Sequence, residues 1–253
     1  MKNDLLTIGI FTIHGYGLMI AIGIIAALLL AYYRAKSKNL DFDKLYSMVM
    51  WAIVLGYVAS KLTYYITIFP TILENPRRLL DLSDGFVVYG GIIGGIATAY
   101  FYCKRHGLRV SEYIDLAIPS VALAQGFGRL GCFLAGCCYG NETSSAFHII
   151  FRESAFAPNN VQLIPTQLIS SFLDFANCFL LLFLSKRVKH NGQITALYFI
   201  FYSIGRFALE FFRGDLIRGS VGSLTTSQFI SPFVCVAGII IFMASRKKQK
   251  SEI

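Results

Sequence analysis

Seven long apolar runs constrain the fold of this chain more than any other feature of its sequence. Their approximate ranges are 12–33, 45–69, 86–103, 113–128, 166–185, 193–212 and 226–245. A helix needs about 20 mainly apolar residues to cross the hydrocarbon core of a bilayer. The sequence therefore predicts an all-α integral membrane protein, a seven-transmembrane helical bundle. The third and fourth runs are short and glycine-rich, which favours tilted, broken or partly re-entrant helices.

The composition agrees with a membrane location. Of the 253 residues, 55% are hydrophobic and only 15% are charged, whereas a soluble domain usually carries about 25% charged residues. The formal net charge is +9, and strongly basic soluble chains often bind nucleic acid. Here the basic residues form short clusters beside the apolar runs. We therefore expect them to set membrane topology, and we expect no nucleic-acid partner.

Basic residues are divided unevenly between alternate hydrophilic segments. One set of segments holds 14 lysines and arginines and the other holds 7, while Lys61 and Arg206 lie inside apolar runs. The positive-inside rule then predicts an N-terminus outside and a cytoplasmic C-terminus. We expect a single transmembrane domain over 1–253, with an outer-face segment at about 129–165. A segment of that length between spans is often functional.

The sixth run carries charged residues at helical spacing. Arg206 and Glu210 are four residues apart, and Tyr202 and Arg213 continue the same face. Charges in a membrane span are costly and usually mark functional sites. The alternative is a structural Arg–Glu pair that joins two helices. Two arginines and one glutamate favour an anionic guest, and phosphate suits the planar guanidinium group.

Residues 126–140 contain five glycines around Arg129. So many glycines disfavour a plain helix, and their exposed amides are suited to an anion-binding nest. Close helix packing through small residues is the alternative. We expect the segment to be functional, because it adds an arginine to the glycines.

Cys132, Cys137 and Cys138 follow Arg129 and offer three thiolates. The C-x4-C-C spacing lacks a matching C-x2-C or histidine partner, and adjacent cysteines rarely bind one ion well. We therefore expect no metal. A vicinal disulfide and a thiol nucleophile are further alternatives, and small, soft packing residues are the preferred interpretation.

Two other segments combine glycine with polar rings. Tyr89 precedes Gly90 and Gly91 in the third run, and His14 and Tyr16 lie at the start of the first run. Rings at the membrane surface are more often anchors than catalysts. Lys61 and Gln167 are weaker candidates for functional residues. A lysine in a span can extend its amine toward the interface.

Taken in order, these segments resemble those of the bacterial prolipoprotein diacylglyceryl transferase family, and the chain looks like a divergent member. The matching segments are HGYG, DG-x3-YGG, GRLGCFLAGCCYG, PTQL, Y-x3-RFALEFFRGD and TSQFIS, which cover about 9–240. The arginine-centred segments are specific, whereas HGYG and PTQL alone are weak. The resemblance implies a seven-span bundle with its N-terminus outside, which agrees with the distribution of charge.

The resemblance also implies a reaction. Phosphatidylglycerol would donate its diacylglyceryl group to the lipobox cysteine in the signal peptide of a secreted prolipoprotein, forming a thioether and releasing glycerol phosphate. It implies a multi-pass enzyme of the bacterial cytoplasmic (inner) membrane, with membrane lipids as partners and no cofactor. Such an enzyme must stabilise the leaving phosphate and help to deprotonate the thiol.

The resemblance assigns roles to individual residues. Arg129 and Arg206 would bind the phosphate, Glu210 would orient an arginine, and Tyr89 is the remaining catalytic candidate. The expected substrate-binding residues are Tyr16, His14, Gly90, Gly91, Gly128, Cys132, Gly136, Gly140, Tyr202, Arg213 and Gln228.

This sequence departs from the family pattern at several positions. Tyr89 stands where many members have a histidine, and Cys132 and Cys137 replace an asparagine and a glutamate. Tyrosine is a poor base at neutral pH, because its ordinary pKa is about 10. A related lipid transferase with another acceptor is therefore an alternative. An anion or lipid transporter is less favoured, because the polar residues concentrate toward the outer half.

Overall fold

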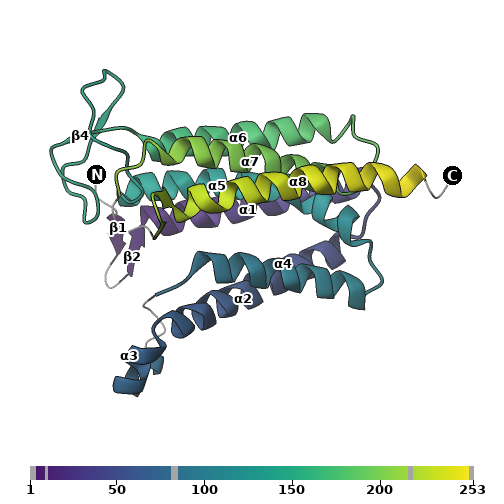
Figure 1. The fold of residues 1–253 in the computed structure, drawn as a ribbon, viewed down its shortest axis with the longest axis horizontal. Helices are drawn as coiled ribbons and strands as arrows, with labels where there is room; N and C mark the ends of the chain where they lie inside the picture. Colours follow the sequence, from purple (N-terminus) through teal and green to yellow (C-terminus); the bar gives the residue numbers. More distant parts are fainter. Residues whose placement is uncertain (1–3, 9–10, 81–84, 216–218, 251–253) are drawn as a thin grey trace. The chain divides into compact units, whose positions relative to one another are not determined.

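A computed structural model describes residues 4–8, 11–80, 85–215 and 219–250, and most of them are helical (Figure 1). The helices are α1 (Gly15–Ser37), α2 (Phe42–Thr67), α3 (Phe69–Glu74), the 3-10 helix η1 (Pro76–Leu80), α4 (Val88–Arg105), α5 (Val110–Ala135), α6 (Thr166–Leu184), α7 (Gln193–Glu210) and α8 (Thr226–Lys250). The strands form three short antiparallel pairs, β1 (Asp4–Ile8) with β2 (Phe11–His14), β3 (Ile149–Ile150) with β4 (Gln162–Leu163), and β5 (Ser220–Val221) with β6 (Leu224–Thr225).

Five helices among the described residues are long and apolar enough to cross a membrane. They are Gly15–Ser37, Phe42–Thr67, Val110–Ala135, Thr166–Leu184 and Thr226–Arg246. The structure thus supports a helical membrane protein and five of the seven expected spans. The other two, α4 and α7, have 18 residues each, which corresponds to about 27 Å of helix. That length is close to the thickness of the hydrocarbon core.

Two expected boundaries were wrong. The first run begins as strand β2, and its helix starts only at Gly15. The fourth run is not short, because α5 continues through the glycine-rich segment to Ala135. Arg129 therefore lies on a helix and not in a nest of loop amides. The helix tolerates its glycines because neighbours pack closely against them: a Cβ at Gly131 would lie 3.1 Å from Cδ2 of Tyr16.

The chain divides into two compact units, Arg34–Ile114 and the combination of Met1–Tyr33 with Asp115–Ile253. In the first unit, α4 packs closely against α2. A Cβ at Gly90 would collide with Thr63 and would lie 2.9 Å from the Ala59 carbonyl oxygen. Lys61 is 6% exposed, and its Nζ lies 5.0 Å from the ring centres of Tyr65 and Phe86 and 3.5 Å from the Gly85 carbonyl oxygen before α4.

In the second unit, α7 packs against both α6 and α8 (Figure 1). Buried Ala122, Cys178, Leu181, Ile194 and Tyr198 form a core between α5, α6 and α7. A hydrogen bond of 2.9 Å from Ser171 Oγ to the Gly126 carbonyl joins α6 to α5.

The long connection between α5 and α6 has a small core of its own. Phe151, Ala157 and Leu163 are buried there, around the β3–β4 pair. The first part of the connection is hydrogen-bonded to the end of α7. Gly140 forms a β-bridge with Arg213, and the Asn141 amide donates to the Phe212 carbonyl at 2.8 Å. This connection therefore brings the end of α5 next to the end of α7.

Candidate functional site

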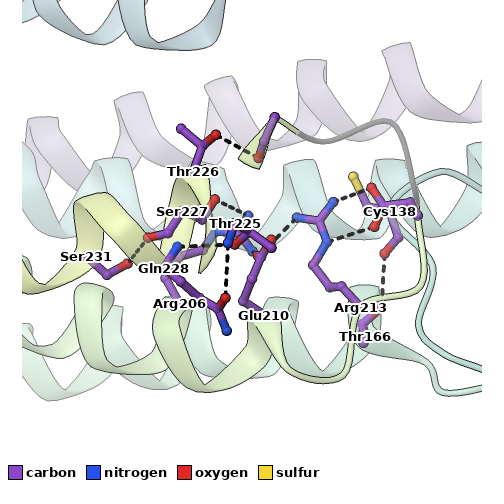
Figure 2. A network of polar contacts seen from close by, with 12 residues as sticks. Cys138, Thr166, Arg206, Glu210, Arg213, Thr225, Thr226, Ser227, Gln228 and Ser231 are labelled. Atoms are coloured by element: carbon purple, nitrogen blue, oxygen red, sulfur yellow. Dashed lines mark hydrogen bonds and ion pairs between the residues drawn. The ribbon is translucent and has the colours of Figure 1, made fainter. Parts of the chain in front are cut away.

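A buried glutamate joins two arginines at the end of α7. Arg206 Nη1 lies 2.8 Å from Glu210 Oε2, and Arg213 Nη1 lies 3.9 Å from the same oxygen. The Glu210 side chain is 0% exposed. The i, i+4 spacing expected from the sequence therefore forms an ion pair, and Arg213 joins it from just beyond the helix (Figure 2).

Polar groups from neighbouring segments fix both arginines. Arg206 Nη2 donates to Ser227 Oγ at 2.8 Å, from the first turn of α8. Arg213 forms a bidentate pair with Asp215, with distances of 3.0 Å from Nε to Oδ1 and 2.6 Å from Nη2 to Oδ2. These contacts orient the guanidinium groups before any ligand arrives, which lowers the cost of binding an anion.

Gln228 supports this arrangement through the start of α8. Its Oε1 accepts from the Thr225 amide at 3.2 Å, and Thr225 Oγ1 accepts from the Gln228 amide at 3.3 Å. This reciprocal cap fixes the turn on which Ser227 reaches Arg206 (Figure 2). Gln228, which the sequence analysis names as a substrate-binding residue, therefore caps the start of α8 in the structure.

Arg129 approaches the same group from α5. Its charge interacts with Tyr202 and Asp174 and acts on Arg206. The structure therefore brings together the two arginines predicted from separate segments. Three carboxylates, Glu210, Asp215 and Asp174, face the three arginines. The group therefore has no surplus of positive charge, and an anionic ligand would be recognised by the oriented N–H groups of the guanidinium side chains.

A cavity of about 310 Å³ lies between α6 and α7, beside Arg206. Its lining combines Asp174, Asn177, Tyr202 and Arg206 with apolar side chains. Asn177 is 8% exposed, and within the described residues its amide atoms have no hydrogen-bond partner. Sequence reasoning missed Asp174 and Asn177, although an acidic residue inside the apolar run 166–185 was a usable signal.

The segment after α5 turns back on the helix. Gly136 has φ +76° and Cys138 has φ +58°, both in the left-handed region. Two almost fully buried side chains of α6 hold this turn: Gln167 Nε2 donates to the Cys137 carbonyl at 2.8 Å, and Thr166 Oγ1 donates to the Cys138 carbonyl at 2.9 Å. Gln167 is therefore a scaffold residue of this turn.

The turn gathers the three cysteines that the sequence analysis considered together but disfavoured as metal ligands because of their spacing. The sulfur atoms of Cys132, Cys137 and Cys138 all lie within 4.8 Å of one another, and each residue is half-buried. Hydrogen bonds from the Cys132 and Cys137 thiols lower the pKa of Cys138, burial opposes this, and Arg213 and Arg129 reinforce it. Hydrogen bonds with the Cys132 and Cys138 thiols, together with burial, raise the pKa of Cys137.

Other predicted residues surround this cluster. Tyr16, 44% exposed, packs against Gly131 near the cysteines, and His14 is exposed at the end of β2. A Cβ at Gly128 would make only an ordinary contact with Ile20. A Cβ at Gly140 would collide with the Ile164 carbonyl oxygen, so glycine is required there.

Tyr89, Gly90 and Gly91 belong to the other compact unit. Tyr89 is 39% exposed in the first turn of α4. Gly90 and Gly91 lie against Thr63 and Ser60 of α2. Within this unit the two glycines permit close packing of two helices, which was the alternative interpretation for such residues.

Comparison with known proteins agrees with the motifs found in the sequence. Residues 3–244 match the family described as prolipoprotein diacylglyceryl transferase. The chain is 46% identical over 250 residues to the phosphatidylglycerol–prolipoprotein diacylglyceryl transferase of Clostridium tetani, covering 99% of this chain and 100% of that protein. It is 44% identical to transferase 2 of the same name in Clostridium perfringens, covering 95% and 94%. The enzyme so named in Finegoldia magna is 32% identical, covering 92% and 91%. The chain therefore belongs to the bacterial prolipoprotein diacylglyceryl transferase family.

Proposed function

We propose that this protein transfers the diacylglyceryl group of phosphatidylglycerol to the thiol of a lipobox cysteine in a prolipoprotein signal peptide. The observation that carries the proposal is the pair of Arg206 and Arg213 around buried Glu210, with Arg129 close enough for its charge to act on Arg206, next to a cavity with mainly apolar walls. The printed names of the relatives support phosphatidylglycerol as donor and a prolipoprotein as acceptor.

The reaction is a substitution at carbon. The acceptor sulfur attacks the diacylglyceryl carbon that bears the phosphate, the C–O bond breaks, and its electron pair leaves with glycerol phosphate. Negative charge grows on the phosphate oxygen as the bond breaks. Arg129 and Arg206 are assigned to this charge, because guanidinium groups fixed in a water-poor site stabilise it without reorganising.

Glu210 is a positioning residue in this mechanism. It lies 2.8 Å from Arg206 and holds that guanidinium toward Ser227. Arg213 is fixed by Asp215 and lies on the other side of Glu210 from Arg206. Tyr202 and Gln228 are assigned to the binding of the phospholipid donor. Tyr89 is kept as a catalytic candidate. The residues assigned to substrate binding are Tyr16, His14, Gly90, Gly91, Gly128, Cys132, Gly136 and Gly140.

The proposed topology follows the distribution of basic residues. All seven apolar runs cross the cytoplasmic membrane as one transmembrane domain, with the N-terminus outside and the C-terminus inside. The segment at about 129–165 and the arginine-rich end of α7 then face outward, where secreted precursors emerge. An outward-facing site beside a cavity with mainly apolar walls suits a phospholipid donor.

A reconstituted assay tests the proposal. The purified protein is mixed with phosphatidylglycerol and a lipobox peptide, and mass spectrometry measures the peptide. We expect a gain of one diacylglyceryl group on the cysteine and none on a peptide with serine at that position. Phosphatidylethanolamine replaces the donor as a headgroup control.

Absence of any mass gain, with an active family member as control, would refute the proposal. Transfer to small thiols but not to the peptide would instead support the related transferase with another acceptor. The replacement of family residues by Cys132 and Cys137 is the observation that favours this second candidate function, a related transferase with another acceptor.

A further inference from the structure

The three sulfur atoms of Cys132, Cys137 and Cys138 form a preorganised group. Cys132 lies in the last turn of α5, and the left-handed backbone at Gly136 folds the chain back, so that the Cys137 amide donates to the Cys132 carbonyl at 3.1 Å. The left-handed backbone at Cys138 then directs the third sulfur to the other two. All three thiols are free, and all lie within 4.8 Å of one another.

Buried side chains of α6 hold this geometry in place. Gln167 and Thr166, each 1% exposed, bind the carbonyl oxygens of Cys137 and Cys138. The backbone that carries two of the sulfurs is therefore fixed by hydrogen bonds that no ligand needs to supply. A site whose ligand positions are fixed in advance binds a metal without the cost of ordering a loop.

The donor set has a defined preference. Thiolates select soft or borderline ions such as Zn²⁺. Zn–S bonds of about 2.3 Å place the sulfurs of a tetrahedral site about 3.8 Å apart, so sulfurs within 4.8 Å need only a small movement. Three thiolates and one Zn²⁺ carry a net charge of −1, and the charges of Arg213 and Arg129 act on Cys138 to offset it.

We propose that Cys132, Cys137 and Cys138 bind one Zn²⁺ ion, and that its fourth coordination position receives the thiol of the acceptor cysteine. Zinc sites with three protein ligands and one open position are typical of catalysis, whereas structural sites have four. Among the described residues, no fourth histidine, cysteine or carboxylate joins the group. Each of the three cysteines is only half-buried, so the group is not sealed from its surroundings.

This inference rests on the proposed function and supplies what the sequence lacks. Tyr89 stands where many family members have a histidine, so another group must activate the thiol. A thiol that coordinates zinc loses its proton, here to water. The resulting sulfur forms the S–C bond as the C–O bond to phosphate breaks, and glycerol phosphate leaves with the electron pair. The thioether product is a weaker ligand and departs, and water or the next thiol replaces it.

Metal binding is measured first, without any phospholipid. The full chain is purified under reducing conditions, treated with chelator, and titrated with Zn²⁺, followed by elemental analysis. We expect about one ion per chain in the wild-type protein and in Cys235→Ser, a free cysteine in α8 outside the cluster. Cys132→Ser, Cys137→Ser and Cys138→Ser should each weaken binding by about tenfold or more, since even outer-sphere changes cost that much.

Co²⁺ then reports the fourth position. Bound Co²⁺ should show a thiolate charge-transfer band and the visible bands of a tetrahedral site. A lipobox peptide should alter the visible bands, while the peptide with serine in place of cysteine should not. Thermal unfolding with and without Zn²⁺ checks folding, because zinc should stabilise only wild type and Cys235→Ser.

The outcomes separate this inference from the proposed function. Failure of the reduced protein to bind Zn²⁺, binding that survives the cluster substitutions, or full transfer by metal-free protein would each overturn the zinc site and leave diacylglyceryl transfer intact. Zinc binding and a peptide-induced Co²⁺ spectrum without transfer from phosphatidylglycerol would support the site and refute the donor. An unchanged Co²⁺ spectrum with the cysteine peptide would refute the role of the fourth position.

Discussion

At the scale of single residues, Glu210 orients the guanidinium groups of Arg206 and Arg213. Its carboxylate is fully buried and lies within 3.9 Å of a nitrogen atom of both Arg206 and Arg213. A buried charge without a partner costs several kcal/mol, so neither side of this ion pair can be removed without consequence. Because the arginines must be charged and oriented before the donor phosphate binds, the carboxylate contributes to positioning and to stability alike.

Replacing Arg206 tests the phosphate site. We expect Arg206→Ala to lower the rate of diacylglyceryl transfer by about 10²–10³-fold, the usual loss for one stabilising donor in a site of this kind. Arg206→Lys should lose less, because it keeps the charge but not the fork of donors that reaches both Glu210 and Ser227. Transfer rates in the reconstituted assay are the measurement.

Arg187→Ala is the matched control for this prediction. Arg187 is exposed beyond the other end of α6, where it stacks on Phe183. The Arg187→Ala variant should transfer the diacylglyceryl group at the wild-type rate. If Arg206→Ala and Arg187→Ala are equally active, the phosphate assignment of Arg206 is wrong.

Gly140 tests the close approach of backbones beneath the site. A Cβ there would collide with the Ile164 carbonyl oxygen and lie 2.9 Å from that of Phe212, so Gly140→Ala should destabilise the protein by about 1–3 kcal/mol. A Cβ at Gly17 would have no atom within 4 Å. Gly17→Ala should therefore leave the stability of the protein unchanged or raise it slightly, since alanine favours helix. Thermal unfolding in detergent compares the two, and equal melting temperatures would contradict the packing described.

At the scale of elements, α7 is fixed at both ends by residues from other helices. At its start, Asp115 of α5 accepts hydrogen bonds from the Gly192 amide at 2.7 Å and from the Thr195 amide at 2.8 Å. At its end, Ser227 of α8 accepts from Arg206. A helix held in this way presents Arg206 and Glu210 at a fixed height and rotation, which a site built from several helices requires.

Removing the cap at the start of α7 should be costly. Asp115 is 4% exposed, so Asp115→Ala leaves buried amide donors unsatisfied and should cost about 2 kcal/mol or more. Asp41→Ala removes an exposed cap of α2, where Asp41 Oδ1 accepts from the Lys44 amide at 3.2 Å, and should cost about 1 kcal/mol or less. The difference in unfolding temperature tests this order, and a larger effect of Asp41→Ala would reverse it.

At the scale of the whole molecule, the membrane determines which surfaces are stable. Exposed apolar side chains cover α2, α4 and α8, including Trp51, Ile93 and Val236. In water such a surface would drive aggregation, whereas in lipid it needs no cover. The distribution of basic residues then orients the spans.

Reporter fusions test this orientation and the odd number of spans. We expect a fluorescent protein fused to the C-terminus to be active in the cytoplasm, and an alkaline phosphatase fused there to be inactive. Phosphatase fused within residues 143–148, on the outer connection, should be active. The opposite pattern would reverse the topology. Phosphatase activity at both fusion sites would mean an even number of crossings between them, in place of the three expected.

Part of the site was predictable because it depends on local spacing. The i, i+4 relation of Arg206 and Glu210 needs only a helix, and the apolar runs identified that helix. The glycine-rich segment was misread for the opposite reason. Its helix is stable only because Tyr16 and Phe175 pack against Gly131 and Gly126, and neither neighbour is visible in the local sequence.

The sequence by itself determined the membrane class, five of the helices that could span it, and the family, because hydropathy and motif order are local properties. Only the tertiary structure decided that Arg129 lies on a helix within electrostatic range of Arg206, that Asp174 and Asn177 line a cavity, and that three cysteines converge. These relations depend on how α5, α6 and α7 pack, and on a left-handed turn held by buried α6 side chains. Long-range packing of that kind leaves no periodic signal in the residues it brings together.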